Sequence, residues 1–141
     1  MINLRYFWQV QLKWAKQKIG RQKCHSFFSE LGYTVFNPRR VDWDSSWKQE
    51  YENPQFFQQV TWELNALKQA DIIVMYFIPD TQSPISLLEL GLFAESGKLH
   101  VVCPQGFWRK GNIEIVCDRY EIPLYDNLQD LKTHFLTLDT N

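Results

Sequence analysis

The alternation of hydrophobic and polar residues predicts a strand at the start of the chain. In residues 2–12 (INLRYFWQVQL) every even position is hydrophobic, which is the period of a strand. The spacing of Leu4, Trp8 and Leu12 by four also allows a helix there. Residues 13–31 change to a helical period, and Gly32 stands where a helix-ending glycine belongs.

The same change of period recurs along the rest of the chain. Strands are predicted at 33–36, 72–78, 99–103 and 122–125. Helices are predicted at 54–69, 84–96, 113–120 and 127–138, with a loop at 107–112. The helix at 54–69 begins with Pro54 after Asn53 as its cap. Its buried face is expected to hold Phe56, Phe57, Val60, Leu64 and Leu67.

Alternating strands and helices predict a three-layer α/β fold, doubly wound like Rossmann or flavodoxin domains. We expect a mainly parallel sheet of four to five strands, with the apolar segment 72–78 buried at its centre. Nothing in the sequence divides residues 1–141, so a single domain is expected. Ligands of such sheets bind beyond the carboxyl ends of the strands, here residues 37–40, 79–83 and 104–112.

Composition narrows the class of protein. The net charge of −1 provides no basic field for a nucleic acid polymer. The longest apolar run is far too short to cross a bilayer, and no signal peptide is found. The 3 cysteines and 3 histidines are scattered without disulfide or metal spacing. We therefore expect a cytoplasmic protein that binds no nucleic acid polymer, membrane or metal.

Three acidic residues are candidates for chemistry. Glu89 lies among leucines near the start of a helix, so it either compensates the helix dipole or serves as a partly buried active-site acid. Glu63, on the preceding helix, fits either a solvated face or the upper edge of the sheet. Asp80 follows the central strand at its carboxyl end, where ligands bind.

Basic and aromatic residues gather at the same strand ends. Arg39 and Arg40 either clamp a phosphate or carboxylate, or pair with Asp42 and Asp44 nearby. Aromatic residues make up 16% of the chain, and Trp62 is one of four tryptophans at or beside these segments. Such rings either stack on a flat ligand or pack the core. Residues 107–112 form either a lid, a partner surface or a solvated turn.

These motifs together resemble a known family. YFIPD at 76–80, LELG at 88–91 and SGK at 96–98 resemble the nucleoside 2-deoxyribosyltransferase superfamily, and more closely its nucleoside 2-deoxyribosyltransferase-like branch. Further similar segments are FNPRR at 36–40, WEL at 62–64, SPISLLELG at 83–91 and GFWRKGN at 106–112. The resemblance covers roughly residues 33–131.

The resemblance implies roles for individual residues. Glu89 matches the catalytic nucleophile of the family, and Glu63 matches an acidic residue near the sugar and base. Asn112 matches a sugar-binding residue that a neighbouring subunit supplies, which implies a homo-oligomer. Asp80 falls on a family aspartate, whereas Ser83 stands where family transferases have an aspartate that helps to handle the base.

Substrate binding is also assigned by resemblance to Asn37, Arg39 and Trp62, which lie in the similar segments. One segment departs from the family, because residues 1–14 lack the glycine-containing loop that usually follows the first strand.

The function implied is glycosyl transfer or hydrolysis at the N-glycosidic bond of a deoxynucleoside, nucleoside or nucleotide. Glu89 would form a covalent glycosyl-enzyme, which a free base or water then resolves, with no cofactor. Glu63 would either share the acid and base roles or help to stabilise the cationic sugar. The alternatives are a non-catalytic nucleotide-binding or sensor module on the same fold, and a pure interaction domain.

Overall fold

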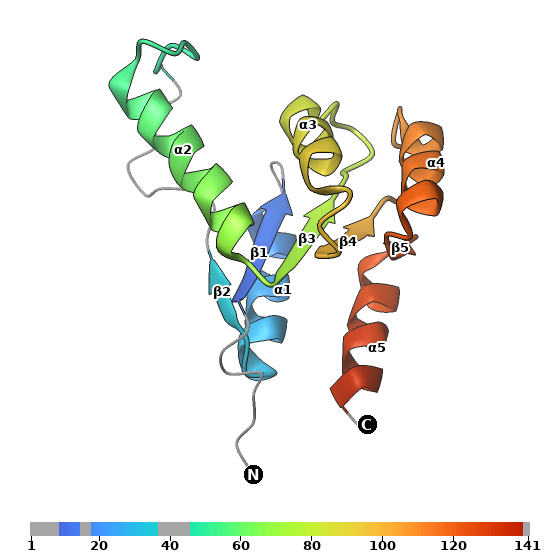
Figure 1. Ribbon diagram of the computed structural model, residues 1–141. Helices are drawn as coiled ribbons and strands as arrows, with labels where there is room; N and C mark the ends of the chain where they lie inside the picture. The colour runs from blue at the N-terminus through green and yellow to red at the C-terminus, as the bar shows by residue number, and fades with distance from the viewer. Residues whose placement is uncertain (1–8, 15–17, 37–45, 140–141) are drawn as a thin grey trace.

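The computed structural model describes residues 9–14, 18–36 and 46–139. Its centre is a five-stranded parallel sheet in the order β2-β1-β3-β4-β5 (Figure 1). The strands are β1 (Gln9–Trp14), β2 (Thr34–Phe36), β3 (Ile72–Tyr76), β4 (Leu99–Val102) and β5 (Leu124–Tyr125). The helices are α1 (Lys18–Glu30), α2 (Pro54–Gln69), α3 (Pro84–Phe93), α4 (Lys110–Tyr120) and α5 (Leu128–Asp139). The predicted α/β class and parallel sheet are confirmed.

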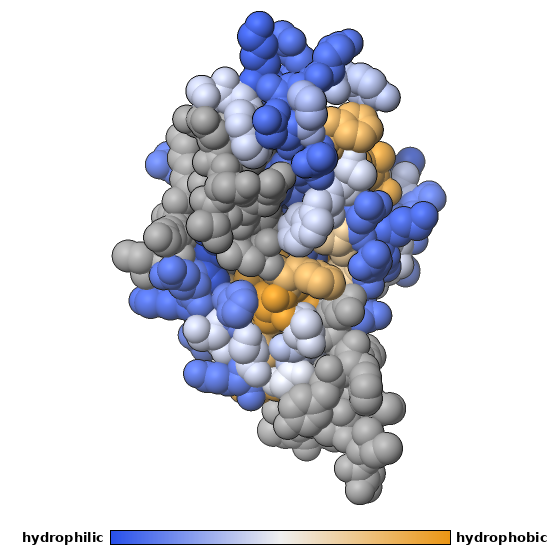
Figure 2. All heavy atoms as spheres, turned by 90° about the vertical axis from the view of Figure 1, so that its left-hand side faces the viewer, coloured by the Kyte–Doolittle hydropathy of each residue, from blue (hydrophilic) through white to orange (hydrophobic). Residues whose placement is uncertain are grey.

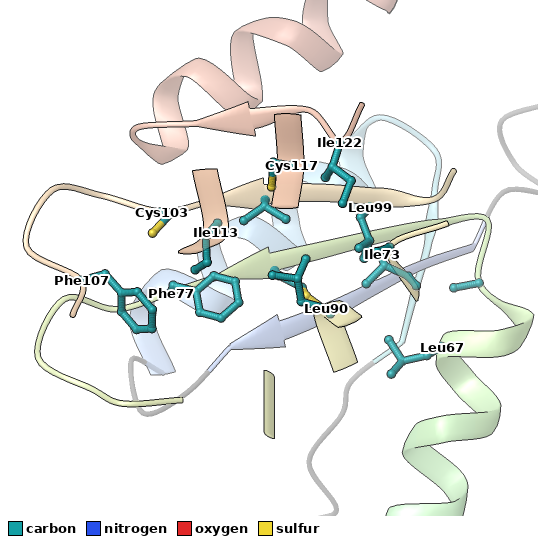
Figure 3. Close-up of a cluster of buried hydrophobic side chains, with 14 residues drawn as sticks. Leu67, Ile73, Phe77, Leu90, Leu99, Cys103, Phe107, Ile113, Cys117 and Ile122 are labelled. Carbon is teal, nitrogen blue, oxygen red and sulfur yellow. The ribbon is translucent and has the colours of Figure 1, made fainter. Parts of the chain in front are cut away.

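The helices form two layers, one on each face of the sheet. On one face, α1 and α5 contribute Phe28 and Phe135 to a core that includes Val10 and Leu12 of β1. On the other face, α2, α3 and α4 pack on β3 and β4 through a second core. In that core Leu67, Leu90 and Ile113 point toward the sheet, one from each helix (Figure 3).

The ends of two helices follow the local sequence as predicted. The Asn53 side chain accepts a hydrogen bond from the backbone N–H of Phe56 at 3.0 Å, and Pro54 begins α2. Gly32 has a φ of 95°, the left-handed conformation expected of glycine just after a helix.

The predicted buried face of α2 is wrong in part. Leu67 is buried, but Phe57 is 41% exposed and Leu64 is 38% exposed. The first turns of α2 extend beyond the sheet, so only its last turns have a core to pack against (Figure 1). Viewed from the side of α2, the surface is mostly hydrophilic, with hydrophobic side chains near its centre (Figure 2).

Several element boundaries also differ from the prediction, two of them near candidate site residues. Lys13 and Trp14 belong to β1 instead of the following helix, because β1 pairs with β3 in continuous parallel register from Val10 to Trp14. Helix α4 begins at Lys110, within the segment predicted as a loop. Residues 1–8, most of the predicted first strand, lie outside the described residues. In the described part of the chain, no helix is long and apolar enough to span a bilayer.

Candidate active site

The site begins on β1, where two polar side chains, Gln11 and Lys13, are buried. Val10 and Leu12 face the core under α1 and α5, so Gln11 and Lys13 point to the opposite face. They are 0% and 7% exposed, because β2 and β3 flank β1 and helices cover its face. Neither amide atom of Gln11 has a hydrogen-bond partner in the described part of the chain. Buried polar side chains on one face of an interior strand are more typical of a functional site than of a hydrophobic core.

Lys13 brings together two acids from different helices. Its Nζ lies 3.1 Å from Oε1 of Glu89 on α3 and 3.5 Å from Oε2 of Glu63 on α2. The contact of Lys13 with Glu89 is close but poorly aligned for a hydrogen bond. Its contact with Glu63 is a long hydrogen bond. The two carboxylates thus lie on the same side of the sheet, within reach of one ammonium.

Helix α2 also orients Glu63 from its own side. Gln59, one turn earlier, donates a hydrogen bond from Nε2 to Oε1 of Glu63 at 3.0 Å. With Oε1 held by this bond, the other oxygen of Glu63, Oε2, faces Lys13. Gln59 is buried, so this contact is shielded from water. Glu63 is therefore fixed by one partner on its helix and one on the sheet.

Glu89 is the most deeply buried acid of the site. It is 2% exposed, in the middle of α3, where Leu88 and Leu92 are exposed and Leu90 is buried in the core. Burial raises the pKa of Glu89 above its ordinary value, the ammonium of Lys13 opposes this rise, and the charge of Glu63 adds to it. A buried acid with a perturbed pKa and a specific charge partner is typical of functional sites.

Ser83 stands at the start of α3 in a strained backbone conformation. Its φ is 47°, in the left-handed region that residues other than glycine rarely adopt. Its hydroxyl does not cap α3 but lies 2.7 Å from the hydroxyl of Thr81. Thr81 donates to the backbone oxygen of Ile78, so Ser83 must donate to Thr81. The Ser83 oxygen is left as a hydrogen-bond acceptor.

The loop after β4 docks on the turn after β3. Phe107 packs on Phe77 with their ring centres 5.1 Å apart (Figure 3). Trp108 donates from its indole N–H to the backbone oxygen of Gln82 at 3.0 Å, and the guanidinium of Arg109 lies over its ring. The strand-end segments 79–83 and 104–109 therefore form one connected surface.

Three further predicted site residues that the structure describes lie outside the cluster of Lys13, Glu63 and Glu89. Trp62 is exposed on α2 beside Glu63 in sequence, Asp80 is exposed in the turn after β3, and Asn112 is exposed in the first turn of α4. Asn37 and Arg39 lie outside the described residues. Among the residues that are described, no three His, Cys, Asp or Glu side chains form a metal-binding group.

The sequence analysis missed Lys13, Gln11 and Gln59. The signal for the first two was the alternation itself, since polar residues occupy the odd positions of a strand that topology then places inside the sheet. Gln59 precedes Glu63 by one helical turn, which is the spacing at which two side chains on a helix meet.

Two comparisons with known proteins found matches. A family model described as "Nucleoside 2-deoxyribosyltransferase like" matches residues 13–107. The solved structure of a 2-deoxyribosyltransferase from the psychrotolerant bacterium Bacillus psychrosaccharolyticus aligns with a TM-score of 0.62 and 19% sequence identity. The alignment covers 88% of this chain and 90% of that one, and it supports the fold. A comparison with curated proteins returned no match. The matched segment includes Lys13, Glu63 and Glu89 but ends before Asn112.

Proposed function

The chain belongs to the nucleoside 2-deoxyribosyltransferase-like family, and on that premise we propose that it transfers or hydrolyses the glycosyl group of a nucleoside or nucleotide. The reacting bond is the N-glycosidic bond, and Glu89 is the nucleophile. The observation that carries this proposal is the meeting of Glu63 and Glu89 at one buried ammonium. Paired carboxylates in different environments are the usual means of cleaving a glycosidic bond.

The proposed reaction has two steps. A carboxylate oxygen of Glu89 attacks C1′ and forms an ester bond, while the bond from C1′ to the base nitrogen breaks and its electron pair leaves with the base. A second base, or water, then attacks C1′ and releases the Glu89 carboxylate. The incoming atom decides between transfer and hydrolysis, and no cofactor is required.

Glu63 serves in this proposal as the second carboxylate. Its carboxylate lies 3.5 Å from Lys13, in the same cluster as Glu89, so its contribution is to stabilise positive charge on the sugar as the bond to the base breaks. This choice follows from the geometry of the cluster, since both carboxylates converge on one ammonium on the same side of the sheet.

The base would meet Ser83 and the surface formed by 79–83 and 104–109. Since the Ser83 hydrogen is committed to Thr81, its oxygen accepts a hydrogen bond from an N–H of the base. Asp80 and Trp62 border the same end of the sheet, and Asn37 and Arg39 are retained as substrate-binding residues. Arg39 would suit a phosphate on the substrate.

We further propose that the protein acts as a homo-oligomer in the cytoplasm. Asn112 is exposed on α4 and separate from the two acids. In this position it can contribute its side chain to the site of a neighbouring subunit. Ile85, Leu88 and Leu92 form an exposed hydrophobic stripe along α3, with Leu88 60% exposed. A second copy of the chain would bury such a stripe.

Base exchange tests the proposed function. Wild-type protein incubated with deoxyinosine and adenine should form deoxyadenosine, measured by liquid chromatography. Glu89→Gln should abolish the exchange, whereas Glu95→Gln, an exposed acid just after the same helix, should not. The same assay with the 5′-monophosphate distinguishes a nucleotide from a nucleoside substrate. Equal inertness of wild type and Glu89→Gln toward a broad panel would contradict the proposal.

A non-catalytic nucleotide-binding module is the second candidate. The observation that favours it is Ser83, a hydroxyl with a committed proton where family transferases have an aspartate. This candidate predicts that nucleosides or nucleotides raise the melting temperature without being consumed. Ligand turnover by wild type but not by Glu89→Gln would exclude it.

A further inference from the structure

Lys13 has no assigned part in the reaction, yet both carboxylates converge on its ammonium. We propose that Lys13 is a positioning residue: it keeps Glu89 ionised and holds one carboxylate oxygen on the sheet side of α3. This inference rests on the proposed function for its catalytic meaning. The electrostatic part stands on the contacts of Lys13 with Glu89 at 3.1 Å and with Glu63 at 3.5 Å.

The place of Lys13 in the fold makes it a rigid support. It lies on β1, an interior strand, opposite Met75 in the parallel register with β3. At 7% exposure its side chain has little freedom, unlike a surface lysine. An ammonium buried among apolar strands is costly unless it is paired, so the fold has a reason to keep both acids near it.

Two charged groups face Glu89 from the elements packed on α3. Lys13 approaches from β1 and favours the carboxylate, whereas Glu63 approaches from α2 and disfavours it. Burial also disfavours the carboxylate. Without Lys13, the buried Glu89 and the partly buried Glu63 would remain together, and such pairs tend to share one proton. A protonated Glu89 has lost the oxygen lone pair that attacks C1′ most readily.

The charge of the cluster also suits the two steps of the reaction. Two carboxylates and one ammonium carry a net charge of −1, which complements positive charge developing at C1′. Once Glu89 is esterified its charge is lost, and Lys13 then pairs with Glu63 alone. Glu63 is then the remaining acid of the cluster, and its role in the second step is to accept the proton of the water or of the incoming base.

The direct test is the titration of Glu89, which requires no activity. Glutamate carboxyl carbons are labelled with ¹³C, and the Glu89 signal is assigned by its absence from Glu89→Gln. In Lys13→Met the pKa of Glu89 should rise by roughly one to two units, as expected for loss of an adjacent opposite charge. Lys13→Arg should largely restore the wild-type titration, and Lys23→Met, on the exposed surface of α1, should leave it unchanged. An unchanged Glu89 titration in Lys13→Met would overturn the proposal.

A second pair of variants guards against loss of folding. Lys13→Met leaves the buried Glu89 and the partly buried Glu63 unneutralised, so it is combined with Glu63→Gln and compared with Glu63→Gln alone. The double variant keeps the net charge of the cluster, and its Glu89 should still titrate at higher pH than in Glu63→Gln. Equal titration in these two proteins would equally overturn the proposal.

The activity readout separates this inference from the proposed function. In wild type the acidic limb of kcat/KM for base exchange should follow Glu89 ionisation, and Lys13→Met should move it to higher pH by the same amount as the titration. If the role of Lys13 were purely structural, its substitution would lower the free energy of unfolding without moving this limb of the pH profile. A chain that neither exchanges nor releases a base but shows the Glu89 shift in Lys13→Met would refute the proposed function and retain the charge-holding role of Lys13.

Discussion

Glu89 has an energetic cost that only a functional role readily explains. Burial raises its pKa, so the folded protein binds a proton at this carboxyl more tightly than the unfolded chain does. A leucine at this buried position of α3 would pack without that cost. The cluster retains the carboxylate and adds a buried lysine to stabilise it.

The pH dependence of stability follows from the direction of this shift. As the pH rises above 4.5, the unfolded chain releases the Glu89 proton first, so the free energy of unfolding should decline until Glu89 ionises in the folded state as well. Glu89→Gln lacks this contribution. Denaturant unfolding of both proteins between pH 4 and 8 should therefore show Glu89→Gln gaining stability relative to wild type as the pH increases. A constant difference would contradict the burial of an ionising Glu89.

Glu63 should affect rate more than substrate binding. Removing its charge by Glu63→Gln keeps its size and its place beside Gln59 and Lys13, but removes a group that stabilises the cationic sugar. We expect kcat to fall by roughly a hundredfold with a smaller change in KM, measured by steady-state base exchange. The exposed Glu95→Gln serves as the matched control. A change confined to KM would show that Glu63 only binds substrate.

At the scale of elements, the sequence predicted the order and type of the helices and strands well. It predicted less well which face of each element is buried. Helix α2, with its Asn53 cap, begins and ends where its sequence pattern placed it. The error at Lys13 arose because a parallel strand can end in residues that also suit a helix, and only pairing with β3 decides. Glu89 and Glu63 were identifiable from motif and phase. Their convergence on Lys13 was not, because it depends on β1 lying inside the sheet.

The packing of β4, β5 and α5 contains an acid-sensitive element. His100 of β4 lies 3.0 Å through its Nδ1 from the hydroxyl of Tyr125, and packs beside His134 and Phe135 of α5. Burial, helped by the charge of His134, lowers the pKa of His100 from 6.5 to about 4. The folded state thus resists protonation of this ring.

This shift predicts a loss of stability in acid. Between pH 6.5 and about 4 the unfolded chain binds a proton at His100 and the folded chain does not, so the free energy of unfolding should fall by about 3 kcal/mol over this window. His100→Gln should remove most of that dependence. His25→Gln, on the surface of α1, should not. Denaturant titrations at pH 4, 5, 6 and 7 check this, and an unaltered acid dependence in His100→Gln would refute it.

At the scale of the whole molecule, the separation of Asn112 from the two acids predicts sites shared between subunits. If one subunit's Asn112 completes its neighbour's site, two inactive variants should complement each other. Glu89→Gln and Asn112→Ala, co-expressed in equal amounts with different tags, should recover about a quarter of the wild-type activity in a symmetric dimer. Activity no higher than that of the two separate variants would place Asn112 in its own subunit's site or outside any site.

The central claim is that Glu89 forms a bond to the sugar, and trapping that bond tests it most directly. Wild-type protein is mixed with a deoxynucleoside, or with its 5′-monophosphate, quenched in acid and digested, and its peptides are measured by mass spectrometry. We predict that the peptide containing Glu89 gains the mass of one glycosyl group in wild type and in Glu95→Gln, and gains nothing in Glu89→Gln. Base exchange without any adduct on this peptide, or an adduct that persists in Glu89→Gln, would contradict the account.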